Sequence, residues 1–103
     1  MIFELIVSKG NPRIYKHRDL SILDVKDDRL KIIHPKYKRE ILYDEIMSIK
    51  KERGVKLTLK NLEILTFSFP YKAMGGIRGV QEVKNSVRRA SNLYELISDK
   101  MSD

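Results

Sequence analysis

The feature that most constrains the fold is a pair of alternating apolar runs, "VKLTLK" and "LEILTFSF", on either side of Asn61. In the first run every second residue is apolar, and the same holds for the second run from Leu65 onward. Such alternation places apolar side chains on one face of a strand, and the single intervening asparagine predicts a tight hairpin. The residues predicted to face the core are Val55, Leu57, Leu59, Leu65, Phe67 and Phe69.

Further strand-like runs precede this hairpin and are separated by turn-forming residues. The runs are "FELIV" (3–7), "IYKHRDLSILDV" (14–25), "RLKII" (29–33), "REILY" (39–43) and "EIMSIKK" (45–51). Together with the hairpin they make about seven strands within residues 2–69. Short strands at regular hairpin spacing are typical of an antiparallel barrel or sandwich.

The end of the chain has a helical period instead. Apolar residues recur at steps of three and four, which predicts one amphipathic helix over about 80–101: Val80, Val83, Val87, Ala90, Tyr94, Ile97 and Met101. We expect this helix to close one end of the strand assembly, with Val83, Val87, Ala90, Tyr94 and Ile97 facing inward. Residues 70–79 read as a connector, and residues 1–103 as a single domain.

Composition excludes several classes of function. The chain has no cysteine, which rules out disulfides, thiol nucleophiles and cysteine-based zinc sites. Its two histidines, His17 and His34, lack the spacing of a metal site, no catalytic constellation stands out, and no cofactor motif is present. Glu4 interrupts the short apolar start, so we expect no signal peptide, no membrane-spanning segment and a cytoplasmic protein.

The net charge of +7 is unevenly distributed. Segments 9–18 and 31–39 each hold four cations and no acid, and segment 50–60 holds five cations against Glu52. Successive loops of an antiparallel meander alternate between its ends. We therefore expect a positive end built from 9–18 and 34–39, opposite a negative end with Asp27, Asp28 and Asp44.

The order of elements and two local patterns resemble the pleckstrin-homology-like (PH-like) superfold. The first pattern is "ELIVSKGNPRIYKHRDLSILDVKDDRLKII", which is similar to the opening strands and basic loop of PH domains. The second is "KREILYDEIMSIKKERG", which resembles a segment of bacterial PH-like and GRAM-type domains. The resemblance implies a seven-stranded barrel of two near-orthogonal antiparallel sheets with a C-terminal capping helix. The family's frequent tryptophan in that helix is absent, so Leu93 or Tyr94 would take its place.

The resemblance also implies a site for anions. Lipid-binding PH domains carry a lysine, a loop and then K/R-x-R, which Lys9 and Lys16-His17-Arg18 match. The candidate anion-binding residues are Lys9, Arg13, Lys16, Arg18, Lys36, Lys38 and Arg39. The alternation of side chains along a strand argues against part of this site. In an undisturbed strand Lys16 and Arg18 would share a face with Leu20 and Ile22, so all four side chains would point inward. The basic pair would then lie at the barrel mouth or beyond a bulge near Asp19.

Three functions remain open at this point. The first is a non-catalytic module that docks on acidic phospholipid headgroups or another anionic surface, peripherally at a membrane. The second is a protein–protein adaptor or self-assembling unit that uses a sheet edge beside the helix. Nucleic-acid binding ranks third, because Tyr15 and Tyr37 lie in basic stretches but the cations cluster at loops.

Overall fold

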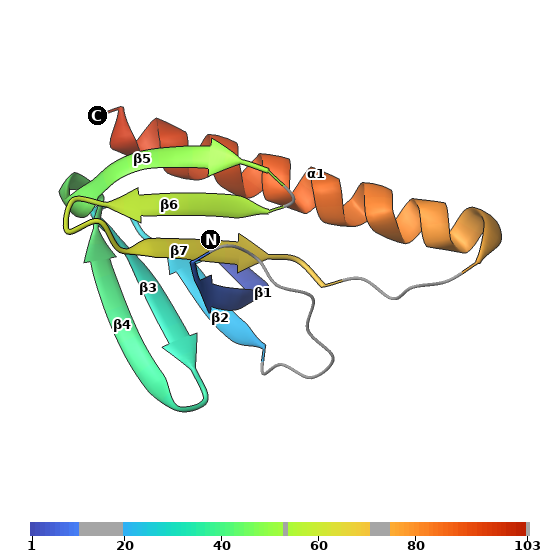
Figure 1. The fold of residues 1–103 in the computed structure, drawn as a ribbon, viewed down its shortest axis with the longest axis horizontal. Helices are drawn as coiled ribbons and strands as arrows, with labels where there is room; N and C mark the ends of the chain where they lie inside the picture. Colours follow the sequence, from blue (N-terminus) through green and yellow to red (C-terminus); the bar gives the residue numbers. More distant parts are fainter. Residues whose placement is uncertain (11–19, 53, 71–74, 103) are drawn as a thin grey trace.

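Strands occupy the first two thirds of the chain and a long helix occupies its end (Figure 1). The computed structural model describes residues 1–10, 20–52, 54–70 and 75–102. Over these residues it has seven strands, one 3-10 segment and one α-helix. Their bounds are β1 Ile2–Lys9, β2 Ser21–Val25, β3 Arg29–His34, β4 Tyr37–Leu42, η1 Tyr43–Glu45, β5 Ile46–Lys51, β6 Val55–Leu59, β7 Ile64–Ser68 and α1 Gly76–Met101.

The described strands form one antiparallel sheet in the order β4-β3-β2-β1-β7-β6-β5. The central strand β1 joins its two halves: residues 2–5 pair with β2, and residues 6–9 pair with β7. β4 and β5 are the edges, and the sheet is not closed. The prediction of an antiparallel β-rich fold with a C-terminal helix is therefore confirmed.

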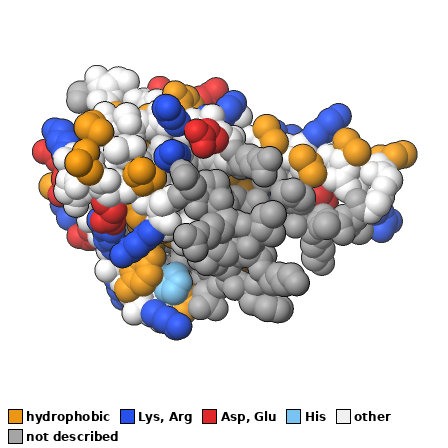
Figure 2. Space-filling model, in the orientation of Figure 1, with side chains coloured by type: hydrophobic (Ala, Val, Ile, Leu, Met, Phe, Trp, Pro, Cys, Tyr) orange, Lys and Arg blue, Asp and Glu red, His pale blue; other side chains and the backbone are white. Residues whose placement is uncertain are grey.

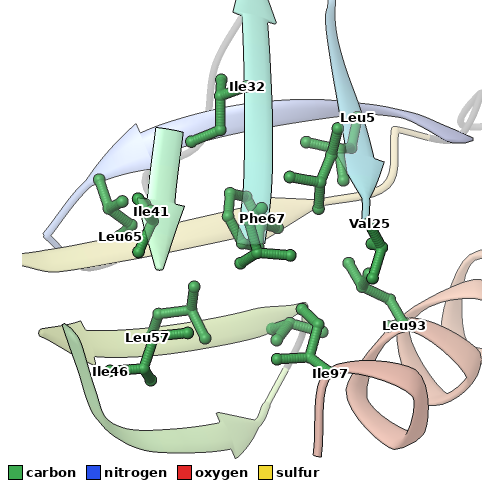
Figure 3. Close-up of a cluster of buried hydrophobic side chains, with 14 of the residues drawn as sticks. Leu5, Val25, Ile32, Ile41, Ile46, Leu57, Leu65, Phe67, Leu93 and Ile97 are labelled. Atoms are coloured by element: carbon green, nitrogen blue, oxygen red, sulfur yellow. The ribbon is translucent and has the colours of Figure 1, made fainter. Parts of the chain in front are cut away.

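The alternation on either side of Asn61 forms the centre of the core. The six residues that were predicted to face the core lie on β6, on β7 and, for Phe69, just after β7. Each of them is at most 5% exposed. Figure 3 shows Phe67 and Leu57 among buried side chains from both halves of the sheet, with Leu93 and Ile97 of α1 pointing toward them. The hairpin itself turns at Leu62, whose φ of 71° is left-handed, while the Asn61 side chain accepts a 2.9 Å hydrogen bond from the Glu63 backbone N–H.

The prediction that Leu20 and Ile22 of the second strand point inward is wrong. In β2 the buried residues are Ser21, Leu23 and Val25, whereas Leu20 and Ile22 are 46% and 37% exposed. The inward face is fixed by the register, in which Leu23 pairs with both Phe3 and Ile32. The basic pair to which this parity argument referred, Lys16 and Arg18, lies outside the described residues.

The expected inward face of the helix is also wrong in its first half. α1 begins at Gly76, four residues before the predicted start, and contacts β5, β6 and η1. Ala90 and Ile97 are buried as predicted and Tyr94 is partly buried, but Val83 and Val87 are 43% and 55% exposed. The first half of the helix extends beyond the strands in Figure 1.

The buried face of the helix includes several small residues instead. The buried residues of α1 are Gly79, Ser86, Ala90, Leu93 and Ile97. Ser86 Oγ donates a 2.8 Å hydrogen bond to the backbone carbonyl of Phe69, which holds the helix near its middle against the residue that follows β7. No helix among the described residues has the length and apolarity required to cross a membrane.

Candidate functional site

The register of the strands separates the charged loops into two ends. β1 starts beside Asp24, with Val25 N–H donating to the Met1 carbonyl at 2.8 Å, and it ends at Lys9. The β2–β3 turn with Asp27 and Asp28 therefore lies at the opposite end of β1 from Lys9. The predicted separation of Lys9 from Asp27 and Asp28 is therefore confirmed.

At the acidic end, most carboxylates have cationic partners. The ion pairs are Met1 N-terminus with Asp24 (3.7 Å), Arg29 with Asp28 (2.9 Å) and Lys100 with Asp27 (2.8 Å). The hydrogen bond from Lys100 lowers the pKa of Asp27. This end is therefore largely compensated in charge.

Tyr43 connects two segments at the acidic end. Its hydroxyl donates a 2.6 Å hydrogen bond to the carbonyl of Lys26, which links η1 to the β2–β3 turn. Burial, and then the nearby charges of Asp27 and Asp28, raise the pKa of Tyr43 to about 12. Asp44 follows Tyr43 in η1, but it also lines a hollow with Arg39, so the predicted separation of charges is incomplete there.

Four of the seven candidate cations can be placed at the other end. Lys9 ends β1, Lys36 lies in the β3–β4 turn, and Lys38 lies on β4; all three are exposed. Arg39 is on β4 and partly buried. The remaining candidates, Arg13, Lys16 and Arg18, lie outside the described residues. Figure 2 shows basic side chains around the lower end of the β3–β4 hairpin.

The turn that carries Lys36 is held by an aromatic stack. The rings of His34 and Tyr37 lie 4.5 Å apart and nearly parallel, at 11°. The backbone N–H of Lys36 donates to His34 Nδ1 at 3.0 Å, which makes Nδ1 an acceptor and places the proton of the neutral ring on Nε2. The stacked rings and this hydrogen bond fix the conformation of the turn that carries Lys36 and precedes Lys38 of β4.

Lys9 and Arg39 come together although they lie on β1 and β4. They line one small hollow of about 120 Å³, whose other walls are Val7, Ile32, Tyr37 and Leu65. A second hollow of about 370 Å³ also reaches Arg39, but Asp44 and Glu45 line it as well. Among the described residues, the walls of the smaller hollow include no carboxylate, whereas those of the larger hollow include two.

Sequence reasoning missed the partner of Arg39. Its guanidinium is paired with the Glu63 carboxylate in a fork, Nη1 with Oε1 and Nη2 with Oε2, the latter at 3.0 Å. This ion pair joins β4 to the β6–β7 turn, across the two halves of the sheet. Glu63 was detectable as the only acid between Glu52 and Glu82 in the sequence. Arg39 is therefore neutralised and contributes less to anion attraction than Lys9.

The Arg39–Glu63 pair predicts a specific dependence on pH. The hydrogen bond from Arg39, and then the charges of Arg39 and Lys9, lower the pKa of Glu63 below its ordinary value of 4.5. A lowered pKa stabilises the fold above that ordinary value, and this stability is lost as the pH falls through the lowered one. Denaturant unfolding at pH 7 and below pH 4 should show a smaller acid-induced loss for Glu63→Gln than for the parent. Arg39→Gln should behave in the same way, and equal losses in all three proteins would refute the assignment.

Comparisons of the chain with protein-family models, curated proteins and solved structures find no match. Among the described residues, no group of three or more His, Asp or Glu side chains could hold a metal ion. Function must therefore be inferred from the placement of charge and apolar surface on this chain.

Proposed function

We propose that this chain is a non-catalytic PH-like interaction module whose basic end docks on an anionic surface, most simply a layer of acidic phospholipid headgroups. One observation carries the proposal: Lys9, Lys36 and Lys38 are exposed at one end, while the carboxylates of the other end are largely paired. Such asymmetry orients a protein in the field of a negatively charged surface.

The arrangement of the strands supports the PH-like part of the proposal. β1 is shared between the strands β2–β4 and the strands β5–β7, which run in clearly different directions in Figure 1. The helix follows the last strand and packs on β5 and β6. In this proposal the two groups of strands correspond to the two near-orthogonal sheets of a PH-like barrel, and the Arg39–Glu63 pair holds them together at one corner.

The chemistry of the basic end favours general attraction over the fitted recognition of one headgroup. Lys36 and Lys38 are exposed point charges, and Arg39 is already held by Glu63. A lysine near an acidic membrane contributes about 1 kcal/mol to binding, and this contribution is screened by salt. Several such residues give membrane association without stereospecificity.

Vesicle binding tests this proposal. We expect Lys36→Gln/Lys38→Gln to bind vesicles of phosphatidylcholine and phosphatidylserine about 30-fold more weakly than the parent, since two cations are removed from the docking end. Sedimentation of the protein with vesicles measures the effect, and the parent should bind less as salt rises.

The matched control is Lys26→Gln/Lys50→Gln. Both lysines are exposed, Lys26 in the β2–β3 turn and Lys50 on β5, the edge of the sheet opposite β4, and the change in net charge is the same. It should retain most of the binding. If the two double variants lose binding equally, net charge alone drives association and the basic end has no special role.

The adaptor function is the second candidate, and one observation weakens its simplest form. β5 is an edge of the described sheet beside α1, but its register shifts between Ile46 and Ser48 and its end carries Lys50 and Lys51. Bulges and lysines on an edge strand oppose the addition of a further strand. Light scattering, run beside the vesicle assay, would identify self-assembly.

A further inference from the structure

The first half of α1 exposes a row of aliphatic side chains. The exposed fractions are 89% for Ile77, 56% for Val80, 43% for Val83 and 55% for Val87. Figure 2 shows hydrophobic side chains in a row along the part of the helix that extends beyond the strands. A contiguous exposed apolar surface on a small protein marks a contact with another molecule or a membrane.

The position of this apolar row on the helix explains why the protein itself leaves it uncovered. In the same half of α1 the buried residues are Gly79 and Ser86, and Ser86 is hydrogen-bonded to the carbonyl of Phe69. Val80 and Val87 each follow one of these residues, so they are turned about 100° away from the contact. The second half of the helix buries Leu93 and Ile97 and needs no other partner.

The border of the apolar row is basic. Residues 76–90 contain Arg78, Lys84, Arg88 and Arg89 against the single acid Glu82. Lys84 lies one turn after Val80, and Arg88 one turn after Lys84, so both cations lie along the row. At its far end Lys51 of β5 reaches the helix, with Nζ donating to Ser91 Oγ at 2.9 Å.

The charge and the area of the apolar row favour an acidic bilayer over a second copy of the chain as its partner. A second copy would bring this excess of cations against itself, and four aliphatic side chains fall short of the roughly 1,000 Å² that a stable protein interface buries. An acidic bilayer satisfies both features, because apolar side chains enter the acyl boundary while flanking cations meet the headgroups. In Figure 2 the apolar row and the basic side chains of the β3–β4 hairpin are visible on the same face.

We propose that the first half of α1 is a membrane-interface element. Ile77, Val80, Val83 and Val87 lie in the boundary between headgroups and acyl chains of an acidic bilayer, and Lys84 and Arg88 contact the lipid phosphates. This inference rests on the proposed function, since both require acidic lipid. It adds an apolar contribution to binding, which salt does not screen.

A single fluorescent label tests where the membrane touches the protein. Because the chain contains no cysteine, Val80→Cys and Arg89→Cys can each carry one environment-sensitive dye. With vesicles containing phosphatidylserine we expect a blue shift at position 80 and little change at position 89, which is exposed and lies on the opposite side of the same helix. Pelleting should fall about tenfold for Val80→Gln/Val87→Gln and rise about tenfold for Val80→Leu/Val87→Leu, with unchanged melting because both positions are exposed.

The outcomes separate the two proposals. Pelleting that depends on Lys36 and Lys38, without a shift at position 80, would overturn the membrane element and leave the proposed function intact. Absence of pelleting would overturn both. A shift that appears without lipid as protein concentration rises would show that a second copy covers the row, which also overturns the inference.

Discussion

Replacing Leu93 by alanine should lower the free energy of unfolding by about 2–5 kcal/mol, the usual range for removing a large aliphatic side chain from a core. Leu93 is 0% exposed and points from α1 toward the strand side chains (Figure 3). The substitution removes buried apolar area and leaves a cavity between helix and sheet. Urea unfolding followed by circular dichroism measures the loss.

The helix provides its own control for this experiment. Val87→Ala removes an aliphatic side chain from the same helix at a position that is 55% exposed, and it should change stability by roughly 0.5 kcal/mol or less. Ile97→Ala should resemble Leu93→Ala, because Ile97 is also 0% exposed. Equal effects at positions 87 and 93 would mean that the helix does not pack on the sheet through the row described.

Replacing Gly54 by alanine should also be strongly destabilising, by about 1–3 kcal/mol or more. A Cβ at this position would lie 2.2 Å from the carbonyl oxygen of Phe67 and 3.3 Å from the Cα of Ser68. Both are backbone atoms of β7 and cannot rotate aside. The start of β6, where Val55 pairs with Phe67, would have to move.

Gly75→Ala is the matched control, because nothing lies within 4 Å of a Cβ built there and its φ is −76°. Because Gly75 is the N-cap of α1, where alanine is disfavoured, this change should lower the melting temperature slightly, whereas Gly54→Ala should lower it much more. Amide hydrogen exchange should locate the damage of Gly54→Ala in β6 and β7. A Gly54→Ala protein as stable as the parent would show that β7 does not approach Gly54 this closely.

The strands were predictable from sequence because each has one buried face, and alternation records that face directly. Val55, Leu57 and Leu59 illustrate this, since all three are at most 3% exposed. The placement of Lys9 opposite Asp27 and Asp28 was predictable for a similar reason, because antiparallel connections leave little freedom in where successive turns lie.

Two features were not predictable in the same way: which residues of the helix are buried, and which residue pairs with Arg39. Periodicity identified an apolar stripe from Val80 to Met101, but not how far the sheet extends beneath it. The sheet covers Leu93 and Ile97 and leaves Val80 and Val87 exposed. Arg39 and Glu63 meet only because the two halves of the sheet approach at one corner, which local sequence does not specify. Part of the predicted anion site, residues 11–19, lies outside the described residues.

The division of β1 between two partners has a consequence for biosynthesis. Its first half can pair with β2 as soon as that strand leaves the ribosome, but its second half must wait for β7, which is synthesised last among the strands. Until then β1 keeps an unpaired edge, and the buried faces of β1 to β4 lack Phe67 and Leu93. A nascent chain of this kind exposes apolar strand surface for most of its translation, so its yield in a cell should depend on chaperones that bind extended segments.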